Sequence, residues 1–368
     1  MGAPLHGLRV VEFENIGPIP HGAMLLADLG ADVVRVARRD RAKDSPFGDY
    51  GRFTHVLRGR TTVYADLKDP AHHALVSDLV ACTDVLLEGF RPGVMERLGL
   101  GPDACTVANP RLVYARMTGW GQDGPRAHLP GHDINYLSLT GALHAIGPAD
   151  RPVPPLSFVG DYGGGSMFLM LGVLAALWER ERTGCGTVVD AAMVDGVAAL
   201  LQPILELRAS GSWSDVRHDN VVDGASPYYR TYECSDGGFM AVGAVEVRFY
   251  QVLVGQLGLD PATLPDRDDR GRWDELAGIL EAKFREHSRD HWTAVFGDTD
   301  ACVTPVLTFE EAPDDDHISH RAALVRTAAG IVSAPAPRLG PAAQPLPGAG
   351  SVSELRTVLT AWQGAGTT

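Results

Sequence analysis

The stretch LRVVEFENIGPIPHGAMLLADLGADVVRV (Leu8–Val36) carries the pattern that decides the fold. It begins with a short apolar strand, Leu8–Phe13, and ends with a second one, Asp32–Val36. Between them, Pro20 suits the first turn of a helix, because proline lacks the N–H that this turn leaves unpaired. Apolar residues at helical spacing follow, and Gly30 is a natural helix end. This order predicts a β–α–β unit with two parallel strands.

The same order repeats downstream of this unit. Strand-like segments alternate with helical ones, and the next strands are expected at 61–67, 84–90 and 112–120. Repeated β-then-α order predicts an α/β fold in which an open, Rossmann-like parallel sheet carries helices on its faces. The turn after the first strand reads ENIGPIPHG and lacks the G-x-G-x-x-G pattern, so bound NAD or FAD is not expected.

The composition excludes several classes of protein. The chain of 368 residues is long enough for two domains, and its net charge of −14 disfavours nucleic acid, whose binding depends on neutralising phosphates. Local arginines such as Arg35, Arg38 and Arg39 suit a small polyanionic ligand, although solvated surface charge is the simpler interpretation of any single one. The five cysteines include no C-x-x-C pair, so neither a disulfide framework nor a zinc site is expected. No run of about 18 apolar residues and no signal peptide is recognised, which predicts a cytoplasmic protein without a membrane span.

A change in texture near residue 223 predicts a second, smaller domain. Upstream of it, a long apolar helix is expected from about Gly164 to Gly184. The segment 223–325 combines strand-like alternation, broken by a hairpin signal at Asp236–Gly238, with amphipathic helices, which is typical of an α+β domain. The expected organisation is a large domain at 1–190 and 333–368, a helical linker region at 191–222, the small domain at 223–325 and a second linker at 326–332.

Asp161 lies in VGDYGGGS (Val159–Ser166), directly before three glycines and the expected long helix. A carboxylate at a helix N-terminus can be a simple cap, which stabilises a helix by about 1 kcal/mol. The glycines weaken a helix by about 1 kcal/mol each, however, and they allow a ligand to approach the backbone closely. Pattern alone leaves Asp161 open between a helix cap and a functional carboxylate.

His132 lies in GHDINY (Gly131–Tyr136), after a Pro-Gly turn and at the start of an apolar helical pattern. Three interpretations are open: a hydrogen-bonded structural histidine, a metal ligand or a general base. A metal site needs further ligands at suitable spacing, and His128 and His144 do not complete a recognised pattern. Pattern alone therefore favours the structural role, and no metal site is expected.

Motifs along the whole chain resemble those of the class III CoA-transferase family, and within it the α-methylacyl-CoA racemases, most closely the bacterial ones. The motifs are GLRVVEF, GPIPHGAMLLADLGADVVRV, GFRPGVMERLGLG, YARMTGWGQDGP, GHDINY, VGDYGGGSMFL, VVDAAMVDG, PYYRTYEC, AVGAVEVRFY and DACVTPVL. The resemblance implies a large Rossmann-like domain built from both chain ends, with a smaller domain between them. It also implies an interlocked homodimer and an acyl-coenzyme A thioester as ligand.

The resemblance gives His132 and Asp161 catalytic roles. The transferase branch uses an aspartate at the position of Asp161 as a nucleophile, whereas the racemase branch keeps it and adds the histidine of GHDINY. The presence of both implies an isomerase that inverts the α-carbon of 2-methylacyl-CoA by proton transfer through an enolate. The alternative is a CoA-transferase that works through an acyl-enzyme on Asp161.

Inversion at one carbon needs two acid/base groups that flank it. Histidine suits this exchange near neutral pH, but aspartate, with an ordinary pKa of about 3.9, is a poor base unless its site raises that value. Backbone N–H groups of Asp161, Tyr162 and Gly163 are expected to stabilise the enolate oxygen. By resemblance, Glu246 in GAVEVRFY is expected to approach from the partner subunit and orient His132.

The resemblance also implies that no external cofactor is needed, because coenzyme A is part of the substrate. Contacts with coenzyme A or the acyl group are expected from Arg38, Arg58, Arg91, Asp133, Tyr136, Tyr162 and Gly163. The chain departs from the family pattern in three places: Leu57 and Gly89 stand where asparagine is frequent, and Glu14-Asn15 stands where small residues are usual. These departures leave the natural acyl group open.

Overall fold

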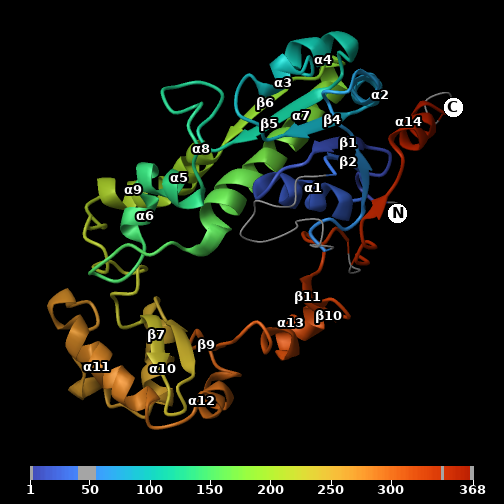
Figure 1. Cartoon of the computed structure of the whole chain (residues 1–368). Coiled ribbons are helices and arrows are strands. Elements are labelled where there is room, and N and C mark those ends of the chain that lie inside the picture. The colour runs from blue at the N-terminus through green and yellow to red at the C-terminus, as the bar shows by residue number, and fades with distance from the viewer. Residues whose placement is uncertain (1–2, 40–54, 341–343, 365–368) are drawn as a thin grey trace. The chain divides into compact units, whose positions relative to one another are not determined.

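The structure is a computed structural model that describes residues 3–39, 55–340 and 344–364 (Figure 1). The chain forms two compact units. Unit 1 comprises Met1–Thr140, Leu156–Leu201 and Ser319–Thr368, and unit 2 comprises Gly141–Pro155 and Gln202–Ile318. Parts of the expected large domain, at 1–2, 40–54, 341–343 and 365–368, lie outside the described residues.

Unit 1 is built on a seven-stranded sheet in the order β12-β3-β2-β1-β4-β5-β6. Every neighbouring pair is parallel. The strands are β1 Arg9–Phe13, β2 Asp32–Ala37, β3 Arg60–Tyr64, β4 Val85–Glu88, β5 Val113–Thr118, β6 Val188–Ala192 and β12 Ser351–Val352. The chain moves outward from β1 through β2 and β3 and then crosses to β4 on the other side, which is the doubly wound order of Rossmann-like folds. The expected α/β fold with an open parallel sheet is confirmed.

Helices pack on both faces of this sheet. Unit 1 carries α1 Pro18–Asp28, α2 Pro70–Ala81, α3 Val94–Arg97, α4 Pro102–Ala108, α5 Asp133–Thr140, α7 Phe168–Thr183, α8 Met193–Leu200 and α14 Leu355–Gly364. Successive side chains of a strand point to opposite faces, so Val10 packs in a cluster with α1 and α7, whereas Val11 packs with α2 and α14. Trp362 of α14 donates its indole N–H to Asp32 at 2.6 Å, so both ends of the chain build this unit.

Buried ion pairs cross the sheet at positions that the sequence pattern does not reveal. Glu12 of β1 bonds Arg60 of β3 at 2.5 Å, and Glu88 of β4 accepts from Arg116 of β5 at 2.7 Å. These four side chains are at most 8% exposed. Each buried charge is thus compensated by an opposite charge inside the protein. Removing one partner of a pair would leave the other buried and unpaired, which is strongly destabilising.

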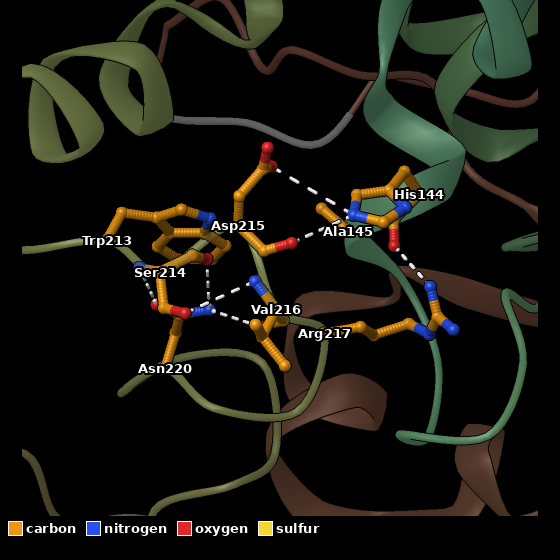
Figure 2. A pocket seen from close by; sticks show the side chains of 8 residues that line it. All are labelled: His144, Ala145, Trp213, Ser214, Asp215, Val216, Arg217 and Asn220. Atoms are coloured by element: carbon orange, nitrogen blue, oxygen red, sulfur yellow. Dashed lines mark hydrogen bonds and ion pairs between the residues drawn. The ribbon is translucent and has the colours of Figure 1, made fainter.

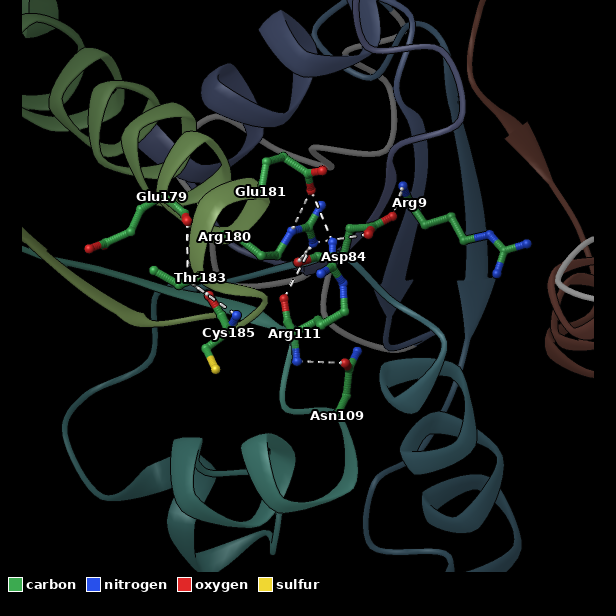
Figure 3. Close-up of polar contacts among 9 residues, drawn as sticks. All are labelled: Arg9, Asp84, Asn109, Arg111, Glu179, Arg180, Glu181, Thr183 and Cys185. Atoms are coloured by element: carbon green, nitrogen blue, oxygen red, sulfur yellow. Dashed lines mark hydrogen bonds and ion pairs between the residues drawn. The ribbon is translucent and has the colours of Figure 1, made fainter.

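Arg180 ties the end of α7 to the residues that lead into β4 and β5, two inner strands of the sheet (Figure 3). Its Nη1 donates to Asp84 Oδ1 at 3.0 Å and to the carbonyl of Arg111 at 3.3 Å. Asp84 precedes β4 and Arg111 precedes β5, so these bonds fix where α7 crosses the sheet. The positive charge also lies in the last turn of α7, where it interacts favourably with the helix dipole.

The helix that carries Asp161 begins earlier than the sequence predicts. A 3₁₀ turn, η2 (Leu156–Phe158), leads into a π-helix, η3 (Val159–Met167), which continues as α7. The expected start near Gly164 is therefore wrong, and Asp161 lies inside the helical run instead of before it. The glycines that weaken an α-helix are accommodated in a wider π turn. Such turns are rare in proteins, and those that occur are frequently at functional sites.

The helical run Leu156–Thr183 is long and apolar enough to cross a membrane, with a mean hydropathy of 1.3 in its 18-residue window. This finding corrects the expectation that the chain has no such segment. Length and composition are weak indicators here, because the core helix of a soluble protein meets the same test. Leu169 and Val173 of this run are buried in the core beside the sheet.

Unit 2 is an α+β unit around an antiparallel sheet in the order β7-β8-β9. β7 (Tyr229–Glu233) and β8 (Phe239–Gly243) form the hairpin that the signal at Asp236–Gly238 predicts, and β9 (Val303–Val306) pairs with β8. Its helices include α6 Ala142–Ala145, α9 Gln202–Ala209, α10 Val247–Gln256, α11 Trp273–Phe284 and α12 Arg289–Phe296. Buried side chains of the sheet and of α10, α11 and α12 form the core of this unit.

The two units have other bounds than the sequence predicts. Gly141–Pro155, expected in the large domain, belongs to unit 2. The expected linker region 191–222 is divided, because α8 belongs to unit 1 and α9 to unit 2. The physical reason is the packing of α8 on η3, where a Cβ on Gly196 would lie only 1.9 Å from the carbonyl oxygen of Gly164. The hairpin β10–β11 (Leu324–Thr327 and Gly330–Ser333) lies in unit 1.

Candidate active site

His132 stands directly before α5, and its main chain starts that helix. Its N–H donates to Asn135 Oδ1 at 3.0 Å, and its carbonyl accepts from the Asn135 N–H at 2.8 Å. This reciprocal pair resembles a capping box, in which backbone and side chain satisfy each other at a helix start. The imidazole is not part of the cap and lies exposed, so its side chain is available for chemistry.

Asp133, the next residue, joins the two motifs. Its Oδ2 accepts a hydrogen bond from the backbone N–H of Asp161 at 2.8 Å. Asp133 is only 8% exposed, so this charge-assisted bond forms away from solvent. The fold thereby brings the segment of His132 against the segment of Asp161, although the two are far apart in the sequence.

The same bond changes the expected set of enolate-stabilising donors. Because the N–H of Asp161 is given to Asp133, it is not free to donate to a thioester oxygen. Tyr162 and Gly163 follow in η3 and are half-buried, and their expected substrate contacts stay predictions.

The carboxyl group of Asp161 has a pKa raised to about 6. Burial is the main cause, and the negative charge of Asp133 adds to it. A hydrogen bond with Ser157 and the attraction of His132 act in the opposite direction. Since His132 acts electrostatically on Asp161, the two candidate acid/bases lie within range of each other. This raised pKa brings the carboxyl group of Asp161 close to neutral pH, where a catalytic acid/base must both give and take protons.

Tyr136, on the first turns of α5, lies within electrostatic range of the same carboxyl. Burial raises the pKa of Tyr136 to about 12, with Asp161 adding to this rise and Arg91 opposing it. The ring meets Trp120 edge-on, with 4.8 Å between ring centroids. The hydroxyl therefore stays protonated near neutral pH, and the charges of Asp161 and Arg91 both act on it.

Two of the glycines after Asp161 allow neighbouring helices to approach η3. A Cβ on Gly164 would lie 2.8 Å from Val197 of α8, and one on Gly165 would lie 3.1 Å from Pro18 of α1. At these two positions the close neighbour is protein and not a ligand, which corrects the sequence interpretation. The π-helix is thus packed between two helices that a larger side chain would push away.

Most of the chain matches one known protein family. It matches the model of CoA-transferase family III over residues 5–351. The chain belongs to CoA-transferase family III. Its racemase-type site motifs lie within the matched region.

Relatives and a solved structure of this kind cover nearly the whole chain. The alpha-methylacyl-CoA racemase of Homo sapiens is 43% identical over 337 residues, which covers 91% of this chain and 86% of the relative. The protein of the same name from Mus musculus is 42% identical over 338 residues, with 92% and 86% covered. A crystal structure of a CAIB/BAIF family protein from Brucella suis has a TM-score of 0.83 at 25% identity, with 99% of this chain and 100% of that one covered.

Arg58 lies in the interior of this family III chain. Its Nε and Nη2 donate to the two carboxylate oxygens of Asp28 at 2.7 and 2.6 Å, and its Nη1 donates to the carbonyl of Ser333 at 3.0 Å. The side chains of Arg58 and Asp28 are at most 2% exposed. Arg58 therefore connects α1 with β11, and the structure gives it a structural role in place of the expected contact with coenzyme A.

Replacing Asp28 with asparagine is expected to destabilise the chain strongly. The amide leaves the buried guanidinium of Arg58 without its counter-charge, which costs about 3–5 kcal/mol of unfolding free energy. Urea unfolding followed by circular dichroism measures this loss. Glu275→Gln is the matched control, because Glu275 pairs with Arg272 in solvent, with side chains 54% and 49% exposed, and it should destabilise the chain far less. Equal losses would contradict the structural role of Arg58.

Glu14 contacts two arginines, one within β2 and one directly after it. Its carboxylate accepts from Arg35 Nη2 at 2.6 Å and from the backbone N–H of Arg38 at 3.1 Å. Arg35 is only 4% exposed, so it belongs to the interior and not to the basic cluster expected from the sequence. The side chain of Arg38 is exposed, and its contact with coenzyme A stays a prediction.

Asn15 and Gly89, two departures from the family pattern, belong to one local arrangement. A Cβ on Gly89 would lie only 2.6 Å from Nδ2 of Asn15. The side chain of Asn15 therefore fills the space that a side chain at position 89 would need. A larger residue at position 89 would therefore require the side chain at position 15 to move or to be smaller.

Unit 2 contributes one predicted residue and one small pocket. Glu246 is exposed at the N-cap of α10, and its role toward His132 stays a prediction. The pocket lies between His144–Ala145 and the loop Trp213–Arg217, where His144 Nε2 is 2.9 Å from the carbonyl oxygen of Asp215 (Figure 2). None of the predicted site residues lines it, so the pocket is not the candidate active site.

The described ranges contain no group of three or more His, Cys, Asp or Glu residues placed to hold a metal ion. The five cysteines are free: Cys82, Cys105, Cys185, Cys234 and Cys302.

Proposed function

We propose that this chain is an α-methylacyl-CoA racemase, an isomerase that interconverts the two configurations of a 2-methylacyl-CoA thioester. The observation that carries this proposal is the hydrogen bond from the Asp161 N–H to Asp133, because it brings the segments of His132 and Asp161 together. The relatives at 42% and 43% identity over most of the chain bear this name.

The proposed reaction moves one proton off the α-carbon and another onto its opposite face. Either His132 or Asp161 takes the α-proton, and the electrons of the broken C–H bond form the enolate, whose oxygen carries the negative charge. The other residue, protonated at that moment, donates its proton to the α-carbon and regenerates the thioester. No external cofactor takes part in these steps, since coenzyme A is part of the substrate.

The test incubates one epimer of a 2-methylacyl-CoA with the purified chain in the absence of any acceptor acid. A racemase converts it to a mixture of both epimers, which chiral chromatography of the released acids separates. A CoA-transferase that uses Asp161 as a nucleophile needs an acceptor and forms an acyl-aspartyl species that hydroxylamine traps. Trapping without epimer conversion would overturn the proposal.

The pH dependence follows from the raised pKa of Asp161. In the direction where Asp161 is the base, it must be deprotonated, so the rate is expected to fall as the pH drops below about 6. Asp133→Asn removes a negative charge that raises this pKa, while the amide oxygen can still accept the Asp161 N–H. The acid limb of kcat/KM should therefore move to lower pH in this variant. An unmoved limb would contradict the assignment of Asp161 as the titrating base.

We also propose that the chain acts as an interlocked homodimer. A stripe of apolar side chains, Met167, Leu171, Leu174 and Trp178, follows one face of the helical run, and Trp178 is 70% exposed. Stripes of this kind are normally covered by a partner. Sedimentation at low micromolar concentration should give a dimer, and Leu171→Glu should weaken it. A folded, active monomer of the unchanged chain would contradict the proposal, and binding to liposomes would show that lipid covers the stripe instead.

The remaining proposals concern location and partners. The five free cysteines support a cytoplasmic location. The proposed partners are an acyl-CoA thioester and a second copy of the chain, without a membrane. The net charge of −14 supports the proposal that nucleic acid is not a partner.

A further inference from the structure

Helix α1 contacts the π-helix η3 through a polar pair that the proposed reaction does not use. His21 Nδ1 lies 2.7 Å from Ser166 Oγ, and Ser166 is fully buried. The hydroxyl of Ser166 donates to the carbonyl of Tyr162 at 3.1 Å. A serine hydroxyl has one proton to give, so Nδ1 of His21 must be the donor in the first bond. The result is a chain of two bonds from His21 through Ser166 to the backbone of Tyr162.

The charge state of His21 suits a fixed donor. Burial and the positive charge of Arg58 lower the pKa of His21, Arg60 acts in the same direction, and Asp28 acts against them. The ring is therefore neutral at physiological pH, with its proton on Nδ1. A neutral imidazole whose Nδ1 proton is directed at Ser166 provides a fixed hydrogen-bond donor to that hydroxyl.

The carbonyl that this chain of bonds reaches belongs to the residue directly after Asp161. A π-helix is a rare conformation, and rare backbone conformations persist where the surrounding structure holds them. The bond from Ser166 spans the turn that begins at Tyr162, and the rings of His21 and Tyr162 also pack with 4.8 Å between their centroids. Both contacts restrict the peptide that follows the candidate acid/base.

The start of α1 borders the carboxyl group itself. A Cβ on Gly17, which has a φ of 69°, would lie 3.3 Å from Oδ2 of Asp161. One turn further along, the same helix presents His21 to Ser166. Helix α1 thus contacts η3 on both sides of the peptide that Asp161 shares with Tyr162.

We infer that the His21–Ser166 pair is a positioning element that holds the π turn of η3 and thereby keeps the Asp161 carboxyl in its working place. The inference rests on the proposed function for the role of Asp161, and it adds a residue of α1 to the machinery of that site. His21 touches no reacting atom in this account, so it is a positioning residue and not a catalytic one.

The test compares variants that remove or keep the donor. His21→Leu fills a similar volume without a donor, Ser166→Ala removes the bridge, and His21→Asn places an amide N–H near the position of Nδ1. His21→Leu and Ser166→Ala should lower kcat for epimer interconversion by about 10- to 100-fold, because small displacements of an acid/base group have effects of this size. KM should change by less than about 3-fold, and His21→Asn should recover most of kcat.

Further comparisons separate positioning from general stability. The double variant of His21→Leu with Ser166→Ala should lose no more than either single one, since the two residues act in one chain of bonds. His73→Leu is the matched control. His73 of α2 is half-buried, and its Nε2 lies 2.6 Å from the carbonyl oxygen of Leu98, so the variant removes a comparable histidine hydrogen bond away from the site. It should leave kcat unchanged. Unchanged kcat in His21→Leu, or an equal loss in His21→Asn, would overturn the inference.

A second readout keeps the inference testable if the chain shows no racemase activity. The pKa of Asp161, measured by ¹³C NMR of labelled aspartate carboxyls, should move in His21→Leu and stay in place in His21→Asn and His73→Leu. If the unchanged chain interconverts no epimers, the proposed function fails, and this pKa alone decides the inference. An Asp161 pKa that His21→Leu leaves unmoved would overturn it.

Discussion

His132→Ala is expected to lower epimer interconversion by at least about 10²-fold, the contribution typical of one general acid/base. The loss should lie in kcat, because the imidazole is proposed to act on the α-proton and not on coenzyme A. The fold should survive, since the bonds that start α5 use the backbone N–H and carbonyl of His132, which alanine keeps. Steady-state rates for each epimer and binding of the CoA thioester by calorimetry check both statements.

His128→Ala is the matched control for this variant. His128 is exposed and lies four residues upstream, so it reports what the loss of a nearby surface histidine does by itself. It should leave the rate within about 2-fold of the unchanged chain, as surface substitutions away from special features usually do. Near-full interconversion of both epimers by His132→Ala would show that His132 is not the base.

Asp161→Asn is expected to lower the rate of racemisation by a similar or larger factor, about 10²- to 10⁴-fold. Its effect on α-proton exchange should differ between the two epimers. The amide can neither give nor take the α-proton. His132 can still remove the proton that faces it and return one to the same face. One epimer should therefore keep some α-deuterium incorporation in D₂O without inversion, while the other loses it. NMR of each epimer separately measures this difference.

The asparagine variant is suited to this comparison because it keeps the backbone of the site. The Asp161 N–H that donates to Asp133 is unchanged, and the side chain has nearly the same shape. Asp103→Asn, at an exposed acid in the first turn of α4, is the control and should exchange both epimers normally. Equal residual exchange of both epimers by Asp161→Asn would favour one base that serves both faces, or a nucleophilic aspartate.

The parallel sheet could be predicted because its signals are local. The pattern of apolar strands on either side of a helix repeats along the chain. The observed β1 and β2 start and end within one residue of the strands that the sequence predicts. The segments GHDINY and VGDYGGGS can also be singled out from the sequence, but pattern alone leaves their roles open, and only the resemblance to the family implies that they are catalytic. Their meeting, however, depends on the long-range bond from Asp161 to Asp133, which no local pattern contains.

Other features could not be predicted for the same reason. The pairing of Arg58 with Asp28 and of Arg35 with Glu14 joins residues that are distant in sequence, and an arginine looks the same in a sequence whether it is buried or free. The π-helix has no sequence signature beyond its glycines, so the sequence predicts a helix start several residues after the observed one at Val159. The assignment of Gly141–Pro155 to unit 2 likewise follows from packing and not from composition.

The most direct test of the account is ¹H NMR of a single epimer of a 2-methylacyl-CoA in D₂O with the purified chain and no acceptor acid. If His132 and Asp161 exchange the α-proton as proposed, the α-proton signal disappears while the thioester stays intact, and deuterated product of both configurations accumulates. An α-proton signal that persists until an acceptor acid is added, followed by transfer of coenzyme A to that acid, would contradict the account.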